Sequence, residues 1–238
     1  MNFKRILPMA AIIICFSVFV CLMVHSTQNI GLQTAAAPQR KLPDVLIDPG
    51  HGGEDGGAVS GDVLEKEINL DISHNTADLL KLLGFHVIMT RETDDALTDE
   101  GEDVKKRKYN DMKMRLGMYN SSENNVIISI HQNKFSNASS HGTQVFYSPH
   151  HKNSAYLADC IQFAVKQSLQ PDNDRENKAA GKEIYLLNNT HNPAVLVECG
   201  FISNRAEREK LLNPEYQQQM SLAIAAGFID YCHTGQTN

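Results

Sequence analysis

Two histidines and two glutamates in this chain have the side chains that a catalytic metal site requires: His51, Glu65, His131 and Glu198. Imidazole nitrogens and carboxylate oxygens are common zinc ligands, and a hydrolytic zinc site keeps one position open for water. Such a site also needs a base that accepts a proton from this water. Two imidazoles and two carboxylates could therefore supply three ligands and one base.

Three of these residues follow apolar runs that are typical of buried strands. His51 lies in a glycine-dense loop that directly follows Val-Leu-Ile, His131 ends Val-Ile-Ile-Ser-Ile, and Glu198 ends Ala-Val-Leu-Val. In open α/β sheets, sites form at the carboxyl ends of the strands. The loop around His51 lacks both the phosphate-binding pattern G-x-x-x-x-G-K-[ST] and the dinucleotide pattern G-x-G-x-x-G, which favours a ligand role for the histidine.

Each assignment has a structural alternative. Glu65 opens a predicted helix, where acidic residues are favoured by the helix dipole, and spacing alone does not separate it from Glu67, Glu54 or Asp55. The second histidine could be a hydrogen-bonded core residue. The last glutamate could form a structural ion pair, because a buried carboxylate without a partner is costly.

Strand and helix patterns alternate along the chain and predict one α/β domain, with a twisted, mostly parallel six-stranded sheet and helices on both faces. The expected strands cover residues 45–48, 86–90, 126–131, 142–147, 183–187 and 194–198. Helices are expected over residues 65–83, 106–119 and 153–169. Two further helices should begin after Asn204, which forms a capping box with Glu207, and after Asn213, which precedes Pro214.

The N-terminal residues predict an export signal or an uncleaved membrane-anchor helix ahead of the domain. Lys4 and Arg5 precede an apolar run over residues 6–24, which is nearly long enough to span a bilayer. The basic flank predicts a cytoplasmic N-terminus, with the rest of the chain outside the membrane. We therefore expect a signal or anchor over residues 1–25, a polar tether over 26–43 and a catalytic domain over 44–233.

Composition argues against two other kinds of protein. The chain of 238 residues has a net charge of −6 and no basic stripe, so a nucleic-acid partner is not expected. Its five cysteines form no C-x-x-C pair, so a structural zinc bound by cysteines is not expected either.

Four sequence blocks, in order, resemble the zinc-dependent N-acetylmuramoyl-L-alanine amidases of the amidase 3 family. They are Asp-Pro-Gly-His-Gly-Gly at His51, Glu-Lys at Glu65, Ser-Ile-His-Gln-Asn at His131, and Pro-Ala-Val-Leu-Val-Glu-Cys-Gly-Phe-Ile-Ser-Asn at Glu198. The resemblance covers residues 44–231. It implies that His51, Glu65 and His131 bind Zn²⁺ and that Glu198 is the catalytic carboxylate. Gln132 stands where the family usually has alanine.

The resemblance implies hydrolysis of the amide bond between N-acetylmuramic acid and L-alanine, with peptidoglycan as substrate. Zinc would activate water and polarise the carbonyl group, and Glu198 would transfer protons. Two alternatives are a zinc carboxypeptidase that trims stem peptides and a membrane-tethered protein that binds the wall without catalysis. Arg91, Asn133 and Asn204 are candidate polar contacts to the substrate.

The arrangement is also similar to the germination-specific amidases of spore-forming bacteria, since wall-binding repeats are not seen in the sequence. This implies a role in spore cortex maturation, in which muramic δ-lactam forms. The expected location is the outer face of the cytoplasmic membrane or the cell wall, and in a sporulating cell the space between the mother-cell and forespore membranes. Because no autoinhibitory helical insert is expected, control would come from location, expression or an activating protein partner.

Overall fold

The structure is a computed structural model in which residues 42–234 are described. The predicted signal or anchor helix and nearly all of the tether lie outside these residues, so both stay predictions. Within residues 42–234, no helix is both long and apolar enough to cross a membrane.

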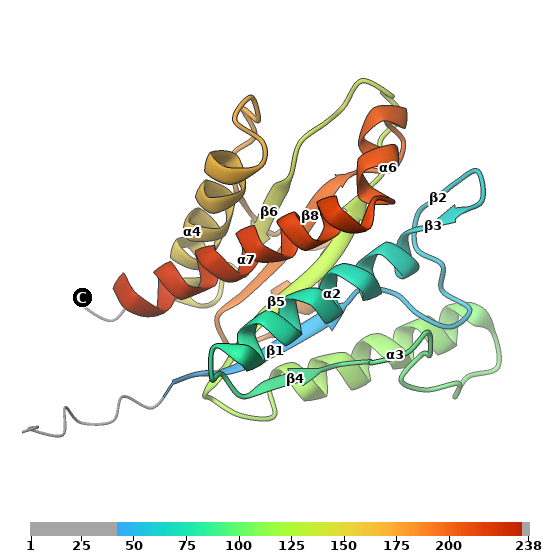
Figure 1. Cartoon of the computed structure of the whole chain (residues 1–238). Helices are drawn as coiled ribbons and strands as arrows, with labels where there is room; N and C mark the ends of the chain where they lie inside the picture. Colours follow the sequence, from blue (N-terminus) through green and yellow to red (C-terminus); the bar gives the residue numbers. More distant parts are fainter. Residues whose placement is uncertain (1–41, 235–238) are drawn as a thin grey trace, which may run out of the picture. The chain divides into compact units, whose positions relative to one another are not determined.

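Six strands form one mostly parallel sheet, which confirms the predicted fold class. The strands are β1 (Asp44–Pro49), β4 (Val87–Met89), β5 (Asn125–Asn133), β6 (Gln144–Tyr147), β7 (Lys178–Ala179) and β8 (Ala194–Phe201). They lie in the order β4-β1-β5-β8-β6-β7; β6 and β8 are antiparallel, and the other neighbours are parallel. This order places the carboxyl ends of β1, β5 and β8 side by side at the centre of the sheet (Figure 1).

Helices cover both faces of the sheet, as predicted (Figure 1). The helices α2 (Glu65–Leu82), α4 (Lys152–Ser168) and α7 (Pro214–Thr234) pack on one face, and α3 (Val104–Tyr119) and α5 (Tyr185–Asn189) lie on the other. Alternate residues of a strand point to opposite faces. Val45 and Ile47 of β1 accordingly join the larger core under α2 and α7, whereas Leu46 joins a smaller core with Tyr119.

One predicted strand is wrong, because residues 183–187 do not extend the sheet. They run into α5, whose leucines pack in the smaller core. A short apolar run without clear periodicity fits a buried strand and a buried helical turn equally well. The sixth strand is β7 instead, which has two residues and pairs with β6. The sequence prediction also missed a small hairpin formed by β2 (Val59–Ser60) and β3 (Val63–Leu64).

The helix starts predicted at Asn204 and Asn213 are present. The side chain of each asparagine accepts hydrogen bonds from two N–H groups in the first turn of its helix, α6 (Arg205–Leu211) and α7 respectively. The predicted capping box is only half formed. The Glu207 carboxylate accepts hydrogen bonds from the N–H groups of Phe201 and Gly142 instead of reaching back to Asn204. Glu207 thereby ties α6 to the end of β8.

A buried carboxylate connects α3 to the sheet just before the loop that carries His51. Asp48 accepts hydrogen bonds from Thr90 and Arg115 on one oxygen, at 2.6 Å each, and from Tyr119 at 2.6 Å and Ser129 at 2.8 Å on the other. Burial alone would raise the pKa of Asp48, but the Arg115 charge and these hydrogen bonds hold it well below its usual range. The pair of Asp48 and Arg115 is therefore ionised inside the protein.

Replacing Arg115 with methionine should lower the free energy of unfolding by about 3–5 kcal/mol, because the Asp48 carboxylate would stay buried without its cation. Urea unfolding followed by circular dichroism measures this loss. In the double variant Asp48→Asn/Arg115→Met, the loss should be smaller than the sum of the two single losses, since the partners are removed together. Losses that add would contradict a direct interaction between the two side chains.

Candidate metal centre

The side chains of His51, Glu65 and His131 meet at the carboxyl end of the sheet. Their ligating atoms all lie within 4.8 Å of one another. Oε1 of Glu65 is 3.3 Å from Nε2 of His51 and 2.9 Å from Nδ1 of His131, and the two imidazole rings meet edge to face with centroids 5.0 Å apart. Two nitrogens and one oxygen at such distances could hold a metal ion such as zinc.

Glu65 is the first residue of α2, and its carboxylate is surrounded by donors. Its Oε2 accepts a hydrogen bond from the N–H of Ala58 at 2.7 Å, and its Oε1 accepts one from the N–H of Gln132 at 3.0 Å. Burial alone would raise the pKa of Glu65, but the hydrogen bonds and charges of the two histidines hold it well below its usual range. Glu67 is exposed, so Glu65 is the acidic residue of this helical turn that faces the histidines.

Gln132, at the position where the resemblance implies alanine, donates hydrogen bonds to Glu65 and to its neighbour Asn69. It is buried, and its side-chain N–H donates to Oδ1 of Asn69 at 3.1 Å. Asn69 in turn donates to Oε1 of Glu65 at 3.3 Å and to the carbonyl oxygen of Gly50 at 3.2 Å. Gln132 therefore contributes a hydrogen bond to the surroundings of Glu65.

Three cationic side chains bind the carbonyl oxygens of the loop that carries His51, and we call Arg91, Arg115 and Lys66 the loop cations. Within residues 49–53, Arg91 and Arg115 each donate to two carbonyl oxygens, and Lys66 donates to one. These bonds stabilise a backbone in which His51 has a φ of +64°, an uncommon conformation for a residue other than glycine.

The expectation that Arg91 contacts substrate is wrong. Its side chain is 5% exposed, and its guanidinium donates to the carbonyl oxygens of Pro49, Gly50, Lys66 and Thr93. From the sequence alone, a polar residue just after a strand could equally face the substrate or the protein interior.

Asp55 orients the ring of His51. Its Oδ2 lies 2.9 Å from Nδ1 of His51, so Nε2 is the nitrogen that faces Glu65, and Lys108 of α3 donates to Oδ1 of Asp55 at 2.6 Å. Burial lowers the pKa of His51, but its hydrogen bonds to the Asp55 and Glu65 carboxylates outweigh burial and raise the pKa to about 9. A metal ion would compete with this proton, because a ligand histidine must be neutral.

Glu198 lies beside these three residues in a different environment. It is in register with His131 across the paired strands β5 and β8. Its Oε2 is buried and has no hydrogen-bond partner within residues 42–234. Burial and the negative charge of Glu65 raise the pKa of Glu198 to about 8. A buried carboxyl oxygen without a partner destabilises a fold, so this arrangement is typical of a group that acts on a bound ion, water or substrate.

Because Gly50 and Gly57 have no side chains, the ligating side chains have room to pack against them. A Cβ atom at Gly50 would lie 2.3 Å from Cε1 and Nε2 of His131. At Gly57, where φ is +69°, a Cβ atom would lie 2.6 Å from both Oε2 of Glu65 and Cδ2 of His51. The glycine-dense loop is therefore required for close packing around the donor set, and the donors fit a small cation.

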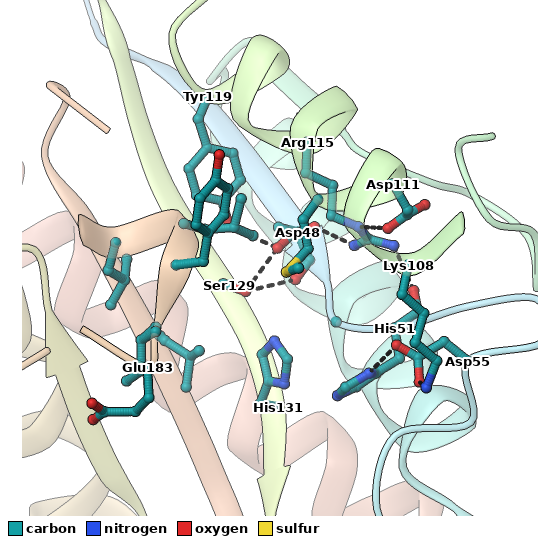
Figure 2. A pocket seen from close by; sticks show the side chains of 17 residues that line it. Asp48, His51, Asp55, Lys108, Asp111, Arg115, Tyr119, Ser129, His131 and Glu183 are labelled. Atoms are coloured by element: carbon teal, nitrogen blue, oxygen red, sulfur yellow. Dashed lines mark hydrogen bonds and ion pairs between the residues drawn. The ribbon is translucent and has the colours of Figure 1, made fainter. Parts of the chain in front are cut away.

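A cavity of about 310 Å³ adjoins the two histidines (Figure 2). Its walls come from α3 on one side and from residues 183–187 on the other, and the buried residues Asp48, Arg115 and Tyr119 also line it. Neither Asn133 nor Asn204, two of the expected substrate contacts, lines this cavity. The side chain of Asn204 is used in the cap of α6.

Comparisons with known proteins identify relatives of this chain. Residues 45–230 match the family Amidase_3, N-acetylmuramoyl-L-alanine amidase. The chain is 37% identical over 188 residues to the germination-specific N-acetylmuramoyl-L-alanine amidase of Bacillus subtilis (strain 168), a match that covers 79% of this chain and 78% of that protein.

Solved structures of similar proteins agree with this match. The CwlD amidase from Clostridioides difficile, in complex with the GerS lipoprotein, is similar with a TM-score of 0.76 and 35% identity, over 79% of this chain and 98% of that one. An N-acetylmuramoyl-L-alanine amidase from Clostridium difficile 630 is similar with a TM-score of 0.70 and 27% identity, over 81% of this chain and 98% of that one.

Replacing Gly50 with alanine should weaken zinc binding by about 10–100-fold, because the added methyl group would displace the ring of His131. Competition with a chromophoric chelator measures the affinity. The matched control is Gly117→Ala in α3, where an added Cβ atom meets nothing within 4 Å. This control should keep zinc affinity and gain about 0.5–1 kcal/mol of stability, since glycine is unfavourable within a helix. Unchanged affinity in Gly50→Ala would show that His131 is not a ligand.

Proposed function

The chain belongs to the amidase 3 family of N-acetylmuramoyl-L-alanine amidases, and from this premise we propose that it is a zinc enzyme of the spore cortex. Its reaction is hydrolysis of the amide bond between N-acetylmuramic acid and L-alanine in peptidoglycan. The zinc proposal is carried by one observation, the cluster of His51, Glu65 and His131 with ligating atoms within 4.8 Å of one another.

We assign zinc binding to these three side chains. When bound, a zinc ion would supply Lewis-acid chemistry, since it would polarise a carbonyl oxygen and lower the pKa of water to about 7. Two imidazoles and one carboxylate are a donor set of known zinc hydrolases. The contact of Asp55 with Nδ1 of His51 leaves Nε2 for the metal. The donors to Glu65 hold its carboxylate ionised, which is the form that binds a cation.

We assign proton transfer to Glu198. Its carboxylate accepts a proton from the attacking water and then donates a proton to the nitrogen of L-alanine as the amide bond breaks. This role is supported by the buried Oε2, which has no competing partner among the described residues. A protein that only binds the wall would have no use for a carboxyl group in this position.

The role in the spore cortex, with formation of muramic δ-lactam, is proposed from the relatives. One of them is named a germination-specific amidase, and another was solved in complex with a lipoprotein. We propose that the apolar residues 6–24 direct export, so that the domain works outside the cytoplasmic membrane, between the mother-cell and forespore membranes of a sporulating cell. We also propose that a protein partner controls the activity.

Full-length protein incubated with purified peptidoglycan should release intact stem peptides with a free L-alanine amine, as identified by mass spectrometry. Chelation should abolish release, and added zinc should restore it, because the carbonyl polarisation is lost with the metal. Release of single amino acids would identify a carboxypeptidase instead. Binding to the wall without any product, by protein loaded with zinc, would identify a non-catalytic binder.

Replacing Glu198 with glutamine should lower kcat by about 10²–10⁴-fold, the usual contribution of a general acid–base group. The variant should still bind one zinc ion, because Glu198 is outside the donor cluster. Initial rates on the peptidoglycan substrate measure kcat, and metal analysis of the same sample measures the zinc content. The matched control is Glu67→Gln, which removes an exposed carboxylate and should leave activity unchanged. A zinc-loaded Glu198→Gln variant with normal kcat would remove Glu198 from this role.

A further inference from the structure

Helix α3 presents two lysines and a tyrosine beside the cavity, and we call Lys106, Tyr109 and Lys113 the α3 patch. Their spacing of three and four residues puts them on one side of the helix. The ammonium groups lie over the Tyr109 ring, 5.6 Å from its centroid for Lys106 and 4.8 Å for Lys113. All three side chains are exposed. The aromatic ring therefore holds two cations close to the surface of the same helix.

The two lysines of the α3 patch differ from the cations next to them. Arg107 and Lys108 pair with Glu54 and Asp55, whereas Lys106 and Lys113 form no ion pair within residues 42–234. The whole chain has a net charge of −6. Two cations without acidic partners on an acidic protein raise the local concentration of anionic ligands.

The α3 patch is continuous with the cavity. The ring of Tyr109 lies against that of Tyr185, with centroids 6.3 Å apart, and Tyr185 lines the cavity together with His51 and His131. Glu183 lines it on the side opposite to Lys108 (Figure 2). A ligand that starts at the histidines can therefore pass along Glu183 in the cavity and, beyond Tyr185, meet the two ammonium groups of the α3 patch.

Building on the proposed function, we propose that this cavity and the α3 patch bind the stem peptide, and that Lys106 and Lys113 select stems with free carboxylates beyond L-alanine. The stem peptide starts at the bond that is cleaved, so it must extend from the histidines. A cavity of about 310 Å³ suits a short peptide segment. Free carboxylates of the stem match the two lysines, and the amine of its diamino acid matches Glu183.

The test compares the full-length double variant Lys106→Glu/Lys113→Glu with the control Lys81→Glu/Lys152→Glu. The control makes the same change of net charge at exposed positions of α2 and α4, on the opposite face of the sheet. Each protein is assayed on glycan fragments with complete stem peptides and on the same glycans with stems trimmed to L-alanine.

For the α3 double variant, KM on complete stems should rise about tenfold at unchanged kcat, because exposed charge pairs contribute modestly and two are reversed. KM on trimmed stems should not change, and the difference should shrink in about 1 M salt. The control should match wild type on both substrates. An equal rise in KM on both substrates, or no rise at all, would overturn the proposal. Weaker binding to anionic phospholipid vesicles at unchanged KM would assign the patch to a membrane surface and overturn it too.

A binding experiment separates this proposal from the proposed function. Free stem tetrapeptide is titrated into full-length Glu198→Gln, with and without the lysine substitutions, and the heat is measured. Peptide binding that is lost with the two lysines supports the α3 patch even if wild-type protein shows no amidase activity. Binding that is independent of the lysines contradicts the α3 patch even if wild-type protein is an active amidase.

Discussion

The candidate site depends on the way the loop cations hold the backbone of residues 49–53. This loop contains a histidine at positive φ and several glycines, a combination that is disfavoured in an isolated chain. Hydrogen bonds from charged donors are stronger than those from neutral donors, and five of them reach the loop carbonyl oxygens. Arg115 also binds Asp48, so one guanidinium connects α3, the end of β1 and the histidine loop. The position of His51 therefore depends on the docking of a helix that begins more than fifty residues later in the sequence.

Two glutamates near the same point have pKa values that are shifted in opposite directions, because their surroundings differ. Glu65 receives hydrogen bonds from backbone N–H groups and lies between two imidazoles, which keeps its pKa low. Oε2 of Glu198 is buried without a donor, and the charge of Glu65 lies nearby; together these raise the pKa of Glu198 to about 8. Pairs of carboxylates whose surroundings separate their pKa values are typical of sites where one binds or stabilises charge and the other transfers protons. This difference supports the separate roles that we propose for them.

The central strands and the meeting of His51, His131 and Glu198 could be predicted from the sequence, because parallel strands of continuous apolar residues end at one edge of a sheet. The choice of Glu65 over Glu67 could not be made from spacing, since both lie in the first turn of α2; burial distinguishes them in the structure.

Other features depend on contacts between distant segments that no local pattern contains. Residues 183–187 are predicted as a strand because a short apolar run fits one, but they lead into the short helix α5 beside α3. From the sequence, Arg91 is a candidate substrate contact and Asp55 an alternative metal ligand. In the structure, Arg91 binds loop carbonyl oxygens and Asp55 orients His51.

The outer strands of the sheet are very short, with three residues in β4 and two in β7. A long edge strand offers a row of unpaired N–H and C=O groups to which another polypeptide can add. Here the long apolar strands are all internal, and the strand at each edge of the sheet has only two or three residues. The fold thus exposes little template for edge-to-edge aggregation, although its central strands would be highly prone to it if they were uncovered.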